Sequence, residues 1–278
     1  MKNVSPRTGF RTPTAWRDPV TRPAGRQHWC LLAVPLLAWL MSPMLAAADR
    51  EDTQSHAPAA TLRPYSTVYN TTARGLSIKL RRELSIDGAG QCRLTSEGSL
   101  LVVGLSEVST FRVDDGHVEP QSYIYQGTGL ISRRREVHFT PDSPVIRSLY
   151  KDEWYALPDI GHTLDRMSQQ EQMRLNLLAH QDSLQEMTFT VADGRKVKDY
   201  TLALIGPERL QTPMGEVDTL LYERQRDNDE RLSQLWVAPD WDYLVVKTLH
   251  IEDGKTVEGN LISARIDGTP VADYIASR

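Results

Sequence analysis

The stretch Asp165–His180 reads DRMSQQEQMRLNLLAH and carries the clearest helix signal in a chain whose other segments show strand patterns. Ser168 and Glu171 have the spacing of a capping box, in which a hydroxyl and a carboxylate each accept a hydrogen bond from an amide of the first turn. The spacing therefore predicts a helix that begins near Ser168 and covers at least residues 168–178.

Apolar residues occupy two sides of this predicted helix. Leu175 and Leu178 fall on one side, while Met173 and Leu177 fall nearly opposite. A helix with apolar residues on two sides needs more than one wall to pack against. We therefore expect a helix that plugs or flanks a curved β-sheet.

The segments before the helix alternate with a period of two, which is the pattern of half-buried strands. Arg82 falls at an inward-facing place in the first such series, either as a side chain that reaches the sheet edge or as a buried, ligand-facing guanidinium. The alternating apolar residues of that series are Leu76, Ile78, Leu80, Leu84 and Ile86.

Asp-Gly pairs recur along the chain, at 87–88, 115–116, 193–194, 253–254 and 267–268. Asp-Gly suits the positive φ angles of tight hairpin turns, and successive hairpins indicate an antiparallel meander. Further strands are expected at Cys92–Val103, Ser106–Val113, His117–Tyr125, Arg133–Phe139, Val145–Tyr150, Glu186–Val191, Lys198–Gly206, Val217–Arg224, Leu232–Ala238, Leu244–Ile251 and Thr256–Ile266.

The predicted fold class is all-β and mainly antiparallel, with one principal helix inserted mid-chain. So many strands exceed what a flat open sheet tolerates, which favours a curved sheet or a barrel-like meander. With no internal repeat and no Gly/Ser linker, residues 63–270 are expected to form a single domain.

Residues 1–48 have the pattern of a signal peptide: a basic region, an apolar run from Trp29 to Leu45 and a terminal Ala triplet. We expect cleavage after Ala48, a disordered lead over residues 49–62 and a periplasmic protein. A retained membrane anchor is the alternative, although the run is short for a ~20-residue span. Because the basic region is long, initiation further downstream, with Val20 one candidate, is a second hypothesis.

Charge and cysteine content exclude some classes of protein. The whole chain has a net charge of −4, and loss of residues 1–48, with six basic residues and one acid, would make it −9. A nucleic-acid partner is therefore not expected. Cys92 would remain as a single cysteine and could form no intramolecular disulfide.

Motifs for known chemistry are absent: there is no G-x-S-x-G, H-E-x-x-H, Walker A or C-x-x-C sequence. We expect no cofactor and no metal, and Cys92 has the position of a small core residue. A metal site formed by His162, Asp165 and His180 would match no standard spacing. Asp240 and Asp242 flank Trp241, an arrangement found where sugars bind, but a turn between two strands explains the segment equally simply.

Arg133, Arg134 and Arg135 form the one basic run after the signal pattern. Strand alternation would place Arg133 and Arg135 on one face and Arg134 on the other. The run is explained by protection of a solvated strand edge or by contact with anionic lipid or polysaccharide.

Several short motifs together resemble the bacterial domain-of-unknown-function family 3108. They are Asp115-Gly116-x-Val118-x-Pro120-x-x-Tyr123, Asp165-x-x-Ser168, Val191-x-Asp193-Gly194, Gly206-x-Glu208-x-Leu210-x-Thr212-Pro213-x-Gly215, Thr219, Arg224 and Trp236-x-Ala238-x-Asp240. The sequence departs from the pattern at Val245, where a Pro is expected. The resemblance spans about residues 65–265 and implies an all-β, exported protein without assigned catalytic residues.

Three functions follow as hypotheses. The first is a non-enzymatic envelope protein that binds a lipid, another apolar ligand or a partner segment in a groove between sheet and helix. There, Met173 and Leu177 would line the groove, with Trp154 and Tyr155 at its mouth. The second is an assembly factor that acts through protein contacts. The third is an envelope-polymer hydrolase that uses carboxylates such as Glu208, Asp240 and Asp242.

Overall fold

The computed structural model describes residues 60–73, 75–100, 103–129, 132–181, 183–225 and 231–275. The predicted signal peptide, its cleavage site and nearly all of the predicted lead lie outside these residues. The chain divides into two units, Met1–Thr53 and Gln54–Arg278, and the fold below is that of the second.

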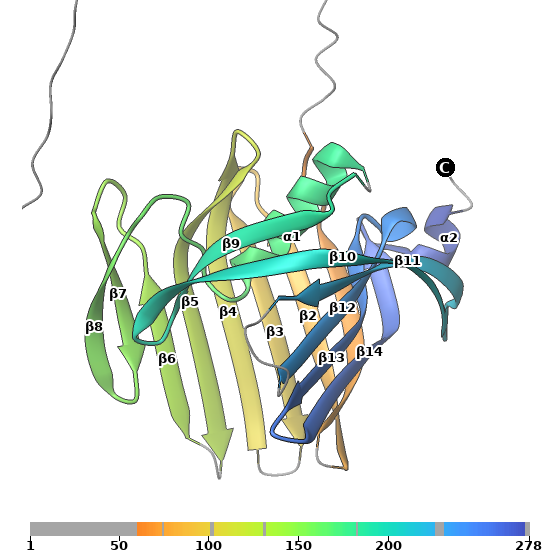
Figure 1. Ribbon diagram of the computed structural model, residues 1–278, viewed down its shortest axis with the longest axis horizontal. Helices are drawn as coiled ribbons and strands as arrows, with labels where there is room; N and C mark the ends of the chain where they lie inside the picture. Colours follow the sequence, from red (N-terminus) through yellow and green to blue (C-terminus); the bar gives the residue numbers. More distant parts are fainter. Residues whose placement is uncertain are drawn as a thin grey trace, which may run out of the picture. The chain divides into compact units, whose positions relative to one another are not determined.

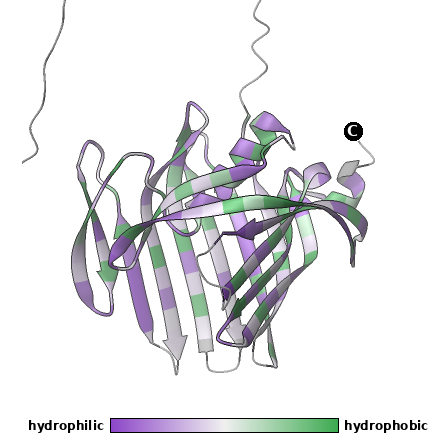
Figure 2. Ribbon diagram, in the orientation of Figure 1, coloured by the Kyte–Doolittle hydropathy of each residue, from purple (hydrophilic) through white to green (hydrophobic). Residues whose placement is uncertain are grey.

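The described residues form one fifteen-stranded sheet whose paired strands are all antiparallel, which confirms the predicted fold class. Green and paler or purple bands alternate along the strands in Figure 2, as half-buried strands require. The strands are β1 Tyr65–Ala73, β2 Leu76–Ile86, β3 Cys92–Leu100, β4 Val103–Asp114, β5 His117–Gly129, β6 Arg133–His138, β7 Val145–Tyr150, β8 Glu153–Pro158, β9 Glu186–Asp193, β10 Lys196–Thr212, β11 Gly215–Arg224, β12 Arg231–Ala238, β13 Leu244–Glu252, β14 Lys255–Ile266 and β15 Thr269–Pro270.

The sheet curls into a nearly closed barrel (Figure 1). The first and last long strands are neighbours, because β1 pairs with β14 from Tyr65 opposite Ile266 to Ala73 opposite Val257. The remaining gap lies between β8 and β9, the two ends of the strand order. Across it, the Ser148 hydroxyl on β7 donates a hydrogen bond to the carbonyl oxygen of Gly194, 2.7 Å away.

Helix α1, Ser168–His180, is the principal helix and confirms the predicted one. It contacts β4, β5 and β9 and so lies inside the curve of the sheet (Figure 1). Its apolar residues are buried on both of the predicted sides, with Leu175, Leu177 and Met173 all in the main core. The short helices η1 Pro239–Trp241 and α2 Val271–Ile275 are the other helical elements of the described residues.

The start of α1 differs from the predicted capping box. The amides of Met167 and Ser168 donate to the Asp165 carboxylate at 2.8 and 3.0 Å, and the Asp165 amide donates to the Ser168 hydroxyl at 2.9 Å. The reciprocal pair is therefore Asp165 with Ser168, one turn earlier than predicted. Glu171 is occupied elsewhere, because its carboxylate accepts hydrogen bonds from Tyr65 and Arg174.

The Asp-Gly pairs form tight turns as predicted in three places, where Asp and Gly both have positive φ: 115–116, 253–254 and 267–268. Three strands were missed: β1, β8 and the two-residue β15. β1 has few aliphatic residues, and β8 follows a turn without glycine, in which Lys151 and Asp152 themselves adopt positive φ.

Candidate functional site

The inner face of the sheet, the face that contacts α1, is built from rows of residues paired across neighbouring strands. Counted from α1 toward the β1–β2 hairpin, the first row is Tyr65, Leu84, Leu94, Ser109, Tyr123, Val137, Ser148 and Tyr155. The second row is Thr67, Arg82, Ser96, Glu107, Tyr125 and Arg135. The third row is Tyr69, Leu80, Gly98, Leu105, Gly127 and Arg133.

Burial falls from the first row to the third. All of the first row is buried except the half-buried Tyr155. In the third row Tyr69 and Gly127 are buried, Leu80, Gly98 and Leu105 are half-buried and Arg133 is exposed. Beyond it, Leu76 is 60% exposed and Val257 is 38% exposed, and both pair with Ala73 at the end of β1. The helix therefore covers one end of the inner face and leaves the hairpin end accessible.

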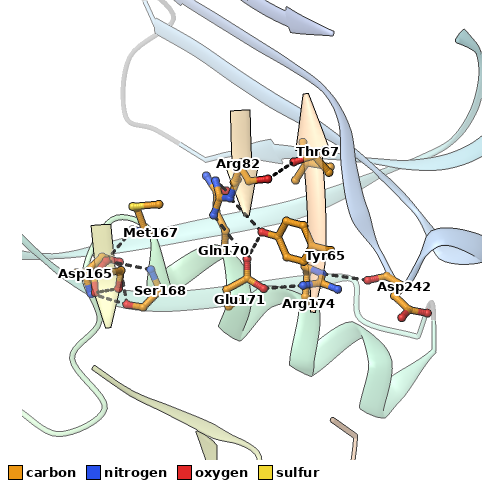
Figure 3. A network of polar contacts seen from close by, with 12 residues as sticks. Tyr65, Thr67, Arg82, Asp165, Met167, Ser168, Gln170, Glu171, Arg174 and Asp242 are labelled. Atoms are coloured by element: carbon orange, nitrogen blue, oxygen red, sulfur yellow. Dashed lines mark hydrogen bonds and ion pairs between the residues drawn. The ribbon is translucent and has the colours of Figure 1, made fainter. Parts of the chain in front are cut away.

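A polar network joins α1 to the first two rows (Figure 3). The Tyr65 hydroxyl donates to the Glu171 carboxylate at 2.7 Å and accepts from Arg82 Nε at 3.1 Å. Arg174 Nη1 donates to the same carboxylate at 2.6 Å, and a second Arg82 nitrogen donates to Gln170 at 2.5 Å. Two guanidinium groups thus hold one buried carboxylate where the helix crosses the sheet.

The network also sets the ionisation of its members. Burial raises the pKa of the Tyr65 hydroxyl, so the phenol stays protonated and serves as a donor to Glu171. Burial alone would lower the pKa of Arg82, but Tyr65 and Glu171 raise it overall, so Arg82 stays charged. Its guanidinium points toward Tyr65 and α1 (Figure 3). Further along the second row, the half-buried Glu107 carboxylate accepts a hydrogen bond from Tyr123 at 2.6 Å.

Asp165 is a further buried carboxylate at the start of α1. Burial raises its pKa, while hydrogen bonds from Ser168, Ser109 and Met167 act in the opposite direction. The Ser109 hydroxyl, in the first row, donates to it at 2.7 Å. Asp165 therefore fixes the helix start to β4 as well as capping it.

The four predicted ligand-binding residues lie in two places. Met173 and Leu177 are buried in the core, whereas Trp154 on β8 is 47% exposed. Trp154 stacks with the guanidinium of Arg147, 4.6 Å from its ring centre, and faces away from α1, because its neighbour Tyr155 is the inner-facing residue. Tyr155 packs on the inner face against the core that contains Met173 and Leu177, so only Trp154 is turned away, and the role of all four residues in binding stays a prediction.

The other residues considered for chemistry are separated or have structural partners. His162 stacks on His117 with ring centres 4.5 Å apart, and Asp165 and His180 lie at opposite ends of α1. Among the described residues there is no group of three His, Cys, Asp or Glu side chains suited to a metal. Cys92 is buried, and burial is the main cause that raises its thiol pKa to about 11.

Two carboxylates of the hydrolase hypothesis, Glu208 and Asp242, have separate partners, and the third, Asp240, is exposed. The Glu208 carboxylate accepts a hydrogen bond from the indole of Trp236 at 2.7 Å, and Trp236 is 4% exposed. Asp242 is buried and accepts from Arg63 Nε at 2.8 Å. These contacts are those of structural residues.

Sequence reasoning missed the network around Glu171. A signal for it exists: Glu171 and Arg174 are charged, lie three residues apart and sit among apolar residues of a helix that needs two walls. Two opposite charges at that spacing on a helix that is surrounded by protein are best explained as a buried pair.

The fold and this face define a class of protein: a nearly closed antiparallel barrel with one internal helix that covers one end of its inner face. The chain belongs to the DUF3108 family, described as a protein of unknown function, whose model matches residues 70–257. No curated protein matches the chain.

The solved structures that match this chain share little sequence with it. A beta-barrel-like protein of domain of unknown function DUF1849 from Brucella abortus is 10% identical, with a TM-score of 0.49, over 75% of this chain and 99% of that one. A putative lipoprotein from Parabacteroides distasonis is 10% identical, with a TM-score of 0.29, over 73% and 96%. A putative outer membrane lipoprotein-sorting protein domain from Vibrio parahaemolyticus is 9% identical, with a TM-score of 0.21, over 74% and 86%. Within the described residues, no helix has the length and apolarity needed to cross a membrane.

Proposed function

We propose that this chain is a non-enzymatic, exported protein of the cell envelope that binds an apolar chain on the inner face of its sheet. The observation that carries the proposal is the fall in burial from the first row to the third. It leaves the aliphatic side chains of Leu80 and Leu105 half-buried on a curved face that α1 does not cover.

The accessible part of this face has the composition of a ligand site. Apolar side chains with a few placed polar groups are typical of small-molecule sites. Here Leu80 and Leu105 supply the apolar part, and Arg82 and Tyr125 of the second row supply polar groups beside it. Leu76 and Val257 extend the apolar surface toward the hairpin end.

The sequence-based binding residues take a different place in this proposal. Met173 and Leu177 lie within the core, so a ligand would reach them only if α1 moved away from the sheet. We therefore place the proposed contacts at Leu80 and Leu105. Tyr155, the half-buried last residue of the first row, lies on β8 next to the gap between β8 and β9.

Export is supported by the sequence of residues 1–48, with its basic region, apolar run and Ala triplet. The proposed location is the periplasm, with an envelope lipid as the expected ligand. A partner segment with an apolar face is the second candidate, because Leu76 and Val257 are exposed at the hairpin end.

Two experiments test the proposal. Native mass spectrometry of protein purified from the cell envelope should show a bound lipid mass, whereas a bound peptide mass would favour the second candidate. A fluorescent fatty acid should bind the wild type. Binding should weaken in Leu105→Gln but not in Ile124→Gln, a control on the opposite face of the neighbouring strand and also half-buried.

The result that would overturn the proposal is a wild-type protein that carries no ligand and never binds the probe. Equal weakening of probe binding in Leu105→Gln and Ile124→Gln would also count against the proposal, because Ile124 lies on the opposite face and should not touch a ligand on the inner face. Melting curves of the two variants establish that each remains folded.

A further inference from the structure

A basic pocket of about 450 Å³ lies at the hairpin end of the sheet, between β6 and the β7–β8 turn. Pairing of β6 with β7 runs only from Glu136 opposite Leu149 to His138 opposite Arg147. The two strands therefore part before they reach their turns, and the pocket occupies the fork. Its lining includes Arg133, Arg134, Arg135, Tyr150, Lys151 and Asp152.

Three of the four cations in this pocket have no carboxylate partner. Arg134 pairs with Glu136 on the outer face. Among the ion pairs of the described residues, none includes Arg133, Arg135 or Lys151. Asp152 is the one acid of the lining, so the pocket is positive within a chain that is acidic as a whole.

Aromatic rings position these cations. The Arg135 guanidinium lies 5.1 Å from the ring centre of Tyr150 and 5.9 Å from that of Tyr125. The Lys151 ammonium lies 5.6 Å from the Tyr150 ring. Stacking on a ring holds a guanidinium in place without using its hydrogen-bond donors on an acid, so the donors stay available to an anion.

Two of the pocket's arginines lie in the same inner-face rows as the proposed apolar site. Arg133 belongs to the third row and Arg135 to the second, as the predicted alternation of the arginine run requires. With neighbouring strands about 4.8 Å apart, Arg133 lies two strands or about 10 Å from Leu105 and four strands or about 19 Å from Leu80 along the row. That span is comparable to an extended long-chain fatty acid.

We propose that the pocket binds the anionic head group of an amphiphile whose apolar chain lies along the third row toward Leu105 and Leu80. This inference rests on the proposed binding function and names its ligand class. Guanidinium groups suit carboxylate and phosphate oxygens because they offer paired donors in one plane. An uncharged chain would satisfy the leucines but leave Arg133 and Arg135 without an acceptor.

The test compares a fluorescent fatty acid with the methyl ester of the same fatty acid, which keeps the chain and removes the charge. The wild type should bind the acid more tightly than the ester, and added salt should weaken binding of the acid but not of the ester. Arg133→Gln with Arg135→Gln should weaken binding of the acid about tenfold or more, because charge-assisted hydrogen bonds are lost, and should leave binding of the ester unchanged. Arg133→Lys with Arg135→Lys should restore part of the difference.

Controls separate a head-group site from general effects. Arg81→Gln with Arg93→Gln removes two exposed charges from the opposite face and should change neither affinity. Lys151→Gln removes another charge from the same pocket at an exposed turn position, so it tests the head-group site without changing a strand residue. Displacement of the acid by lysophosphatidylglycerol, but not by inorganic phosphate at the same concentration, assigns the site to lipids rather than free phosphate.

Each failure has a distinct meaning. Equal affinity for the acid and the ester overturns the head-group site, and so does an equal loss of affinity in the control variant. Either result leaves the proposed apolar binding function intact. The arginines would then be explained as protection of a strand edge. Displacement by inorganic phosphate overturns the lipid assignment. Absence of binding of both probes to the wild type overturns the inference together with the proposed function.

Discussion

The Glu171 carboxylate on α1 accepts a hydrogen bond from the hydroxyl of Tyr65 on β1, 2.7 Å away and 106 positions earlier in the chain. Both side chains are buried, and Arg174 stacks its guanidinium 4.7 Å from the centre of the Tyr65 ring. The helix is thereby tied to the strand that also closes the sheet against β14.

Removal of one member of this group should be costly. Glu171→Ala leaves Arg174 buried without its carboxylate, and breaking a buried pair in this way costs about 3–5 kcal/mol. Denaturant unfolding measures the loss. Asp218→Ala, which breaks an exposed pair with Arg209 on β10 and β11, is the control and should leave the unfolding midpoint unchanged.

A double variant distinguishes the cost of breaking the ion pair from the cost of lost side-chain packing. Glu171→Leu with Arg174→Leu removes both charges, so its loss should be smaller than the sum of the two single losses. Strict additivity would mean that the two residues stabilise the protein independently.

Trp236 provides a second prediction of stability. Its side chain is 4% exposed, bonded to Glu208 and covered by the Lys247 ammonium 4.9 Å from its ring, so Trp236→Ala should cost about 3–5 kcal/mol through the cavity it leaves. Trp154→Ala makes the same change at a side chain that is 47% exposed and should cost far less. Similar losses for the two variants would contradict the burial of Trp236.

Asp165 should give the protein a specific dependence on pH. Its pKa is raised in the folded state, chiefly by burial, so the folded protein binds the proton more readily than the unfolded chain. The stabilisation is complete below the ordinary Asp value of about 3.9 and is lost as pH rises through the raised value.

Asp165→Asn lacks this ionisation and keeps an oxygen to accept the amides of Met167 and Ser168. The wild type should therefore lose stability relative to the variant as pH rises above about 4 and through the raised pKa of Asp165. Unfolding free energies measured at several pH values provide the comparison. Parallel curves for the two proteins would show that the Asp165 pKa is not raised.

Cys92 should react slowly with thiol reagents. Burial raises its pKa to about 11, and the side chain is buried, so little thiolate forms near pH 8 and little reagent reaches it. Labelling of the native protein should be at least about a hundredfold slower than labelling in denaturant. Ser99→Cys in a Cys92→Ser background places a thiol at an exposed position of the same strand and should react at the unfolded rate.

Local signals in the sequence were sufficient for most of the fold. Val145–Tyr150 was predicted at its observed bounds, and the helix was predicted to begin at Ser168, where it does begin, from the spacing of Ser168 and Glu171. The turn after β3 was misplaced, because Leu100 and Val103 continue the apolar run and hide the hairpin. β10 was shortened at Gly206, where the strand continues through a register shift.

The candidate site depended on tertiary facts that alternation cannot supply. Alternation by two indicates that Leu80 and Arg82 face the same side of their strand, but it does not say how far α1 reaches along that face. That limit decides which rows are covered. Glu171 was assigned to a cap for the same reason, since its partner Tyr65 is distant in sequence.

The pairing of β1 with β14 has a consequence for the order of folding. β1 is made first among the strands, yet one of its edges has no partner until residues 257–266, at the far end of the chain, are available. Such distant pairing closes slowly, and an unpaired strand edge invites contact with other chains. Any refolding experiment on this protein should therefore find a late step that is lost when the chain is shortened before β14, together with aggregation of the shortened chain.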